Sequence, residues 1–138
     1  MKPPPPLAAS RAIRVSLVEQ ARRERPRECC GLLVGDGKRI DFAVPLPNIA
    51  ADRARYRIDD VAHIELRRML RRFVPQTAIV GVYHSHPAGG AWPSATDIAE
   101  AFYPEWAYVI VGLGPARPAV RAFRIRSGRV RELAIRWR

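Results

Sequence analysis

The chain contains little cysteine, lysine or histidine, and it has no long apolar run. Its two cysteines, Cys29 and Cys30, are adjacent, and adjacent cysteines rarely pair, so the chain is not a disulfide-bonded scaffold. Two reduced thiols suit a reducing compartment. No apolar stretch approaches the length that a membrane-spanning helix needs. We therefore expect a cytoplasmic protein that does not bind membranes.

The first nine residues hold four consecutive prolines and a single lysine, which does not match a secretory signal. We expect residues 1–9 to be a flexible, proline-rich tail. The remaining residues, 10–138, are long enough to form one domain with its own core. Hydrophobic residues make up 48% of the chain and charged residues 27%, which is typical of globular proteins.

Basic residues outnumber acidic ones by 24 to 13, and only Lys2 and Lys38 among them are lysines. Three interpretations of the net charge of +11 remain open: a coding bias toward arginine, an acidic protein partner, or nucleic acid. The arginines are scattered, and no aromatic-rich nucleic-acid motif accompanies them. We therefore favour the first interpretation over the second, and the second over a nucleic-acid partner.

Apolar periodicity and turn residues predict mixed strands and helices, and hence an α/β protein with a single domain. Ser16 and Glu19 form a capping-box pattern for a helix that Pro26 ends. Asp59 is a candidate N-cap for a second helix that runs to about Phe73. In that helix we expect five apolar side chains to face the core: Val61, Ile64, Leu66, Met69 and Leu70. We expect strands at 28–34, 39–44, 77–84, 106–112, 119–126 and 129–136, loops at 45–58 and 87–93, and a short helix from Ser94.

Two histidines and an aspartate lie close together in the second half of the chain. His84 and His86 follow a predicted buried strand, and alternate residues of a strand point to the same face. Ser94 and Asp97 come soon after and match a capping box, so a purely structural role for them is an open alternative. Two imidazoles and one carboxylate suit zinc and leave a fourth position open, as catalytic zinc sites do. We interpret His84, His86 and Asp97 as metal ligands.

An open zinc site also needs a base that takes a proton from the attacking water. Glu28 is the best candidate by its context, since it stands at the head of an apolar strand, where an unpaired charge is costly. A solvated strand end explains this residue equally well on these grounds. His63 lies in the second predicted helix, away from the cluster, and we interpret it as non-functional. Cys30 shares a predicted strand face with Glu28, but a small buried side chain is its preferred interpretation.

Two segments of the chain resemble the JAMM (MPN+, JAB) zinc metallopeptidases, and among them the small bacterial Mec-type members. The resemblance is carried by Glu28-Cys-Cys-Gly-Leu-Leu-Val-Gly35 and by Tyr83-His-Ser-His-Pro87 with Pro93-Ser-Ala-Thr-Asp97. It extends from about residue 11 to residue 136 and includes Val44-Pro-Leu-Pro-Asn48 and Tyr56-Arg-Ile-Asp59.

The resemblance implies a mixed β-sheet flanked by helices, the JAMM/cytidine-deaminase-like fold. It implies that His84, His86 and Asp97 hold zinc. It further implies that Glu28 acts as the general acid and base and that Ser94 stabilises the oxyanion. The expected reaction is the zinc-dependent hydrolysis of a peptide or isopeptide bond.

By the same resemblance, the expected substrate is a small ubiquitin-like or sulfur-carrier protein, cleaved at its C-terminal Gly-Gly. We expect its extended tail to lie between the loops at 45–58 and 87–93, with Trp92 either forming a wall there or packing on the protein. A deubiquitinase-like isopeptidase acting on lysine-linked conjugates is one alternative. A non-catalytic module that binds protein or nucleic acid is another, and a homodimer is left open.

Overall fold

The computed structural model describes residues 2–138, and within them the chain forms eight strands and three helices. The elements are β1 (Leu7–Ala9), α1 (Arg11–Glu24), β2 (Cys30–Gly35), β3 (Ile40–Leu46), α2 (Asp60–Phe73), β4 (Ala78–His86), α3 (Ala95–Ala99), β5 (Ala107–Gly112), β6 (Ala119–Arg126), β7 (Arg129–Leu133) and β8 (Ile135–Trp137). Six strands form one sheet in the order β3-β2-β4-β5-β6-β7. The sheet is mixed, because β4 and β5 are parallel and the other neighbours are antiparallel.

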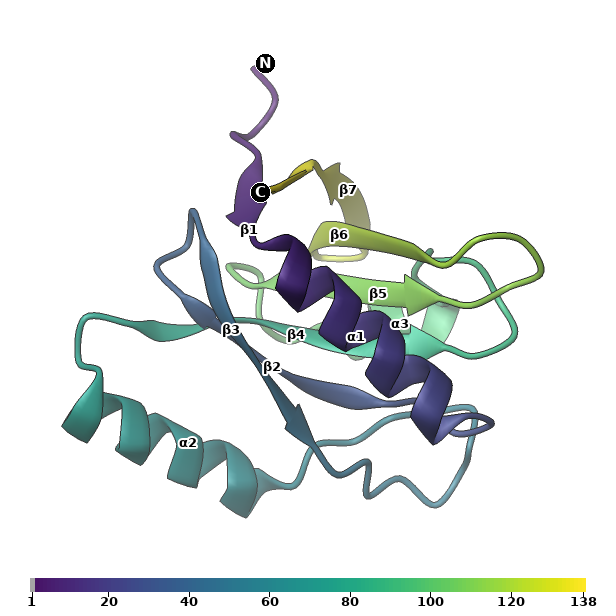
Figure 1. The fold of residues 1–138 in the computed structure, drawn as a ribbon, viewed down its shortest axis with the longest axis horizontal. Helices are drawn as coiled ribbons and strands as arrows, with labels where there is room; N and C mark the ends of the chain where they lie inside the picture. Colours follow the sequence, from purple (N-terminus) through teal and green to yellow (C-terminus); the bar gives the residue numbers. More distant parts are fainter. Residues whose placement is uncertain (1) are drawn as a thin grey trace.

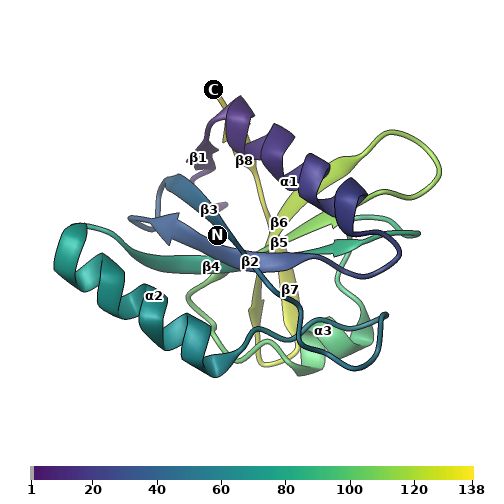
Figure 2. The same ribbon diagram turned by 60° about the horizontal axis from the view of Figure 1, so that its bottom comes forward.

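Helices cover both faces of this sheet (Figures 1 and 2). α1 lies on one face, where Leu17 and Ala21 belong to one of two core clusters. α2 and α3 lie on the opposite face, where Leu66, Leu70 and Ile98 pack against the second cluster. Successive side chains of a strand point to opposite faces, which is why both clusters draw on the same central strands. The expected fold class, a mixed sheet flanked by helices, is confirmed.

The two ends of the chain meet in a small second sheet. β1 pairs in parallel with β8, and both Leu7 and Ala9 are buried in the core. The prediction of a flexible tail over residues 1–9 is therefore wrong for residues 7–9. These apolar residues follow the prolines and add a strand to the fold. Met1 lies outside the described residues. Within residues 2–138 no helix is long and apolar enough to cross a membrane.

The first helix begins earlier than expected. Ser10 is its N-cap, and the Ser10 side chain accepts a hydrogen bond from the Ile13 amide at 3.1 Å. Ser16 lies inside the helix, where its hydroxyl donates to the Ile13 carbonyl at 3.0 Å. The capping box predicted at Ser16 and Glu19 is wrong. Ser16 carries the stronger local signal, since Glu19 completes its capping-box pattern and Ile13 stands at that position after Ser10, but a longer helix buries more apolar surface against the sheet.

The second helix begins after its predicted cap, since the Asp59 carboxylate accepts from the Ala62 amide at 3.4 Å. Its predicted inward face is wrong in part. Leu66 and Leu70 pack against the sheet, but three of the five side chains are half or more exposed: Val61, Ile64 and Met69. The apolar arc of the helix is therefore wider than the strip that contacts the sheet.

Candidate metal centre

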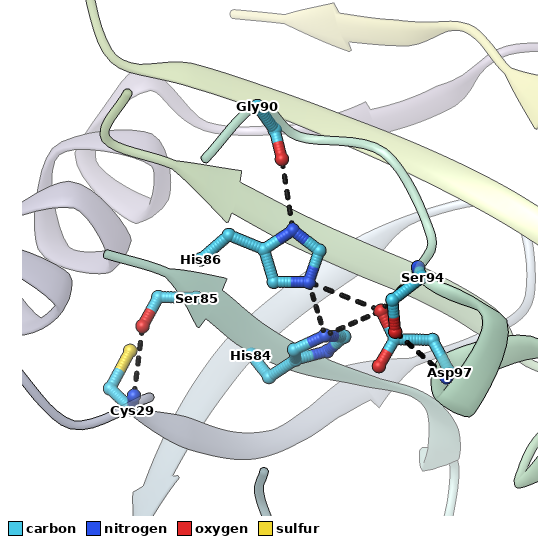
Figure 3. A network of polar contacts seen from close by, with 7 residues as sticks. All are labelled: Cys29, His84, Ser85, His86, Gly90, Ser94 and Asp97. Carbon is cyan, nitrogen blue, oxygen red and sulfur yellow. Dashed lines mark hydrogen bonds and ion pairs between the residues drawn. The ribbon is translucent and has the colours of Figure 1, made fainter. Parts of the chain in front are cut away.

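β4 carries both histidines into the middle of the sheet. It pairs with β2 on one side and β5 on the other, so Cys30, His84 and Ile110 lie side by side across three strands. The strand was expected to end at residue 84, but it continues through His86 and holds both imidazoles on regular backbone. Ser85 lies between them with its side chain on the other face of the strand (Figure 3).

Three candidate ligand atoms form a nearly regular triangle (Figure 3). The Nε2 atoms of His84 and His86 are 3.2 Å apart, and they lie 3.2 and 3.1 Å from Asp97 Oδ2. A tetrahedral zinc ion with bonds of about 2.0–2.1 Å needs its ligand atoms about 3.3–3.4 Å apart. The three side chains therefore have the spacing of three corners around a tetrahedral ion, with the fourth corner open. Their donor set of two nitrogens and one oxygen also fits such an ion.

Both imidazoles are oriented by contacts on their outer sides. His86 Nδ1 lies 2.9 Å from the Gly90 carbonyl oxygen. A carbonyl only accepts, so Nδ1 carries the hydrogen and Nε2 keeps its lone pair for an ion. The His84 ring is stacked on Tyr56, with ring centroids 4.2 Å apart and ring planes at 18°. These contacts hold the two rings in the orientation that brings both Nε2 atoms to one point.

Burial and hydrogen bonds set the charges of the three side chains. Burial lowers the pKa of His84, which favours the neutral imidazole that a metal ion requires. Burial also lowers the pKa of His86, but hydrogen bonds to Asp97 and Gly90 outweigh it and leave that pKa raised. Burial alone would raise the pKa of Asp97, but hydrogen bonds from the two histidines hold it well below its usual range. Asp97 is therefore a carboxylate at neutral pH.

α3 begins with a complete capping box that also positions the carboxylate. Ser94 Oγ accepts from the Asp97 amide at 3.0 Å, and Asp97 Oδ2 accepts from the Ser94 amide at 2.9 Å. The structural role weighed for these two residues is thus present. This cap does not exclude a role at the site. The same Asp97 Oδ2 faces both histidines. The Ser94 oxygen accepts a hydrogen bond within the cap, so its hydroxyl hydrogen is not used there.

Glu28 lies just ahead of β2 and only 8% of it is exposed. Burial raises the pKa of its carboxyl group from 4.5 to about 7, while the charge of His86 lowers this pKa and that of Asp97 raises it. The antiparallel register pairs Cys30 with His84, and the Ser85 amide donates to the Cys29 carbonyl, so the next residue back, Glu28, lies level with His86. Its burial excludes the alternative of a solvated strand end. A carboxyl group that titrates near neutral pH is suited to acid–base chemistry.

The two cysteines are buried free thiols behind the site. Burial raises the pKa of Cys29 to about 11 and that of Cys30 to about 12. Cys30 Sγ lies 3.7 Å from the Leu46 carbonyl oxygen. Within residues 2–138 neither thiol joins the metal-ligating group. The preferred interpretation of Cys30 as a small buried side chain is thus confirmed.

A cavity of about 680 Å³ opens next to Tyr56, and none of the three candidate metal ligands lines it. It is lined by residues between Ala50 and Ile58, by the first turn of α2, and by residues between Glu100 and Tyr108. Tyr56 connects it to the metal centre, since this ring lines the cavity and also stacks on His84. Among the residues that line it, Tyr56 is therefore the one that contacts a candidate ligand.

The walls of this cavity differ from those expected for a substrate groove. The loop at 45–58 supplies one wall, as expected, but the other is the segment between α3 and β5 and not the loop at 87–93. Trp92 packs edge-on against Phe123, with ring centroids 4.9 Å apart, and does not line the cavity. His63 lines the cavity but lies outside the metal-ligating group of the described residues.

Two residues of the site had no predicted role: Asn48 and Tyr56. Asn48 Nδ2 donates to the Glu28 carbonyl oxygen at 2.9 Å, and Tyr56 covers His84. Both lie in segments that carry the resemblance to the JAMM peptidases, which was the available signal. The residue types alone did not point to them, because an asparagine after a proline is common in turns and a tyrosine is common in a core.

The sequence matches the family of prokaryotic homologues of the JAB domain over residues 10–126. The chain belongs to this family. Among its curated relatives, the CysO-cysteine peptidase of Mycobacterium tuberculosis is 34% identical over 120 residues, which cover 85% of this chain and 81% of the relative. A probable TtuB-protein conjugate cleaving protease of Thermus thermophilus is 35% identical over 119 residues, covering 81% and 74%. The desampylase of Haloferax volcanii is 35% identical over 95 residues, covering 67% of each chain.

Solved structures share the fold of this JAB-family chain. A protein of Desulfitobacterium hafniense has a TM-score of 0.84 and 29% identity, covering 96% of this chain and 92% of its own. A structure described as a JAMM metalloprotease-like zinc site in the proteasome and signalosome has a TM-score of 0.57 and 21% identity, covering 94% and 96%. The expected JAMM/JAB family and its class of enzyme, a peptidase, are confirmed.

Proposed function

We propose that this protein is a zinc-dependent metallopeptidase that cleaves a peptide or isopeptide bond at the C-terminal Gly-Gly of a ubiquitin-like or sulfur-carrier protein. The observation that carries the proposal is the triangle of ligand atoms from His84, His86 and Asp97, with the buried Glu28 beside it. Zinc suits two imidazoles and one carboxylate, and an open fourth position serves catalysis rather than structure.

Three parts of the site have distinct roles in the proposed hydrolysis. When bound, zinc supplies a Lewis acid for the scissile carbonyl and for water. Glu28 takes a proton from the attacking water and returns it to the leaving amine, and a pKa of about 7 suits both steps. Ser94 donates its hydroxyl hydrogen to the developing oxyanion, a contact that is worth about 3 kcal/mol in acyl transfer.

The named relatives support the class of substrate. Their names refer to a CysO–cysteine substrate and to TtuB–protein conjugates. The resemblance to the JAMM peptidases implies that substrates of this kind are ubiquitin-like or sulfur-carrier proteins. The cavity of about 680 Å³ beside Tyr56 has the volume for a short extended segment, as the tail of a carrier would be.

The charge of the chain also suits such a partner. A net charge of +11 favours the approach of an acidic carrier, because opposite fields raise the rate of encounter. Added salt should then slow the association, since it screens exposed charges beyond about 10 Å at 0.1 M. An association rate that does not change with salt would leave coding bias as the account of the arginines.

The test of the proposed function uses the full-length, zinc-loaded protein and two substrates built on one acidic carrier that ends in Gly-Gly. One substrate carries a cysteine in peptide linkage after the Gly-Gly, and the other is joined to the side chain of a lysine. Intact mass follows the release of the carrier. Glu28→Gln, which keeps the shape of the side chain, should reduce release to a small residual rate, while Glu19→Gln on the exposed side of α1 should leave the rate unchanged.

The two substrates separate the alternatives. Faster release of cysteine supports a carrier peptidase, and faster release of the lysine conjugate supports the deubiquitinase-like isopeptidase. Binding of the carrier without cleavage of either substrate, by protein that holds a full complement of zinc, would contradict the proposed function and favour a binding module.

A further inference from the structure

One peptide group, between Glu28 and Cys29, is held from both sides by side chains. Its carbonyl oxygen, on Glu28, accepts a hydrogen bond from Asn48 Nδ2 at 2.9 Å. Its N–H, on Cys29, donates to Ser85 Oγ at 2.8 Å (Figure 3). Asn48 follows β3 and Ser85 belongs to β4, so two distant parts of the chain meet at this one peptide group.

The position of the Glu28 side chain depends on this peptide group. The hydrogen bonds and ion pairs of residues 2–138 include none to the Glu28 carboxylate. Glu28 also precedes β2, which begins at Cys30, so the sheet ladder does not hold its backbone. A planar peptide group that is bonded at both of its polar atoms has little freedom to rotate. The two bonds therefore set where the Glu28 side chain begins.

Ser85 ties this segment to the strand of candidate ligands. Ser85 stands between His84 and His86 in the sequence, and its side chain is fully buried. Its own N–H donates to the Cys29 carbonyl at 3.1 Å. Ser85 and Cys29 are thus joined by two hydrogen bonds, one through the backbone and one through the side chain. A shift of β4 would move the ligands and the Glu28 segment together.

Asn48 ties the same segment to the loop before α2. Its amide makes all four hydrogen bonds open to it. Nδ2 donates to the carbonyl oxygens of Glu28 and Arg55, both at 2.9 Å. Oδ1 accepts from the amides of Ala50 and Arg57, at 2.9 and 3.0 Å. One side chain therefore organises this loop and holds the backbone of Glu28.

The loop that Asn48 organises is also a wall of the cavity, and its Tyr56 stacks on His84. The wall, a candidate metal ligand and the candidate base are therefore connected through a few short contacts. A loop displaced by a change at Asn48 would move the wall and the base together.

We propose that Asn48 and Ser85 are positioning residues that hold the Glu28 carboxylate beside the candidate metal ligands, with Asn48 linking that position to the cavity wall. The inference rests on the role proposed above for Glu28 as acid and base. Both residues act through the peptide group between Glu28 and Cys29.

Four variants separate this role from simple support of the fold. Asn48→Asp keeps the acceptor bonds to the Ala50 and Arg57 amides but loses both donor bonds, while Asn48→Ala loses all four. Ser85→Ala removes the acceptor for the Cys29 amide, and Ser85→Thr retains a hydroxyl. The matched control is Thr77→Val, which removes a side-chain hydrogen bond of 2.8 Å to the Val74 carbonyl just before β4.

The kinetic readout is the division of the effect between kcat and KM for the zinc-loaded variants. Asn48→Asp and Ser85→Ala should lower kcat by about 10- to 100-fold, because a displacement of a catalytic group by about 1 Å lowers the rate by up to about 100-fold. KM should stay within about twofold and the zinc content should be unchanged. Ser85→Thr should restore kcat in part, and Thr77→Val should have the wild-type value.

A double-variant test then asks whether the two residues act through Glu28. In the Glu28→Gln background, Asn48→Asp and Ser85→Ala should cause no further loss of the residual turnover, because the group that they position is already gone. Equal losses in the wild-type and Glu28→Gln backgrounds would overturn the proposal, and so would an unchanged kcat in both single variants.

A readout that needs no turnover keeps this test separate from that of the proposed function. Amide hydrogen exchange of the metal-free protein should be faster at Cys29 in Ser85→Ala and unchanged there in Thr77→Val. If the wild type cleaves no carrier, the proposed function fails, and the carboxyl ¹³C shift of Glu28 decides the inference instead. A shift that moves in Asn48→Ala supports the positioning role, and a shift equal to that of the wild type overturns it.

Discussion

The phenol ring of Tyr56 lies against the imidazole of His84, with 4.2 Å between the ring centroids and 18° between the planes. His84 lies in the centre of the sheet, whereas Tyr56 belongs to the loop between β3 and α2. The stack therefore couples the wall of a cavity to a candidate metal ligand. The Tyr56 ring covers one face of the imidazole and excludes water from it. The same contact fixes the plane of the imidazole ring.

Removing this ring should weaken zinc binding. We expect Tyr56→Ala to raise the dissociation constant for zinc by about 10-fold, because contacts outside the ligand shell typically contribute this much. Tyr56→Phe keeps the ring and should bind zinc as the wild type does. Competition with a chelator of known affinity measures both constants. Wild-type affinity in Tyr56→Ala would show that the stack does not orient His84.

The three candidate ligands should each be needed for metal binding. His84→Ala, His86→Ala and Asp97→Asn should all lower the zinc content well below that of the wild type, because two ligands hold zinc far more weakly than three. Elemental analysis of the purified proteins measures this content. His63→Ala is the matched control, since it removes the remaining histidine without touching the triangle. Full zinc occupancy in any ligand variant would remove that residue from the set.

The buried carboxyl group of Glu28 should make the stability of the metal-free protein depend on pH. Its pKa of about 7 lies above the ordinary value of 4.5, so between these values the folded state keeps a proton that the unfolded state releases. The free energy of unfolding should therefore fall as pH rises from 4.5 to 7. Relative to Glu28→Gln, the wild type should lose about 2 kcal/mol over this interval.

Urea unfolding in the presence of a chelator, repeated across this pH range, measures the difference between the two proteins. Glu19→Gln, an exposed substitution of the same chemistry on α1, should follow the wild type at every pH. Parallel pH curves for the wild type and Glu28→Gln would mean that Glu28 is not desolvated in the folded protein.

Cys29 and Cys30 should resist thiol reagents in the native state. Both are fully buried, and burial raises the pKa values of the two thiols to about 11 and 12, so little reactive thiolate is present at pH 8. A chromogenic disulfide reagent should label neither cysteine in the folded protein and both in urea. Rapid labelling without urea would show that this segment opens readily, together with the adjacent Glu28.

Local rules predicted much of the fold. The Asp59 cap, the strand ahead of His84 and the capping box at Ser94 all depend on neighbours within a few residues, and each is present. The start of α1 was wrong because the local capping-box pattern favours Ser16, whereas the packing of a longer helix on the sheet favours Ser10. The inward face of α2 was wrong for Val61 and its exposed neighbours because periodicity shows which side chains are apolar but not how much of the arc the sheet covers.

The sequence by itself determined the likeness to the JAMM/JAB family and the grouping of His84, His86 and Asp97. Strand alternation places His84 and His86 on one face, and the capping box places Asp97 at the start of a helix shortly after them. Both patterns depend only on residues nearby in the sequence. Only the tertiary structure decided that Glu28 is buried beside the group and that Asn48, Tyr56 and Ser85 hold the site in place. Those contacts join β2, β4 and the loop before α2, and the pairing of distant segments is set by the packing of the whole sheet.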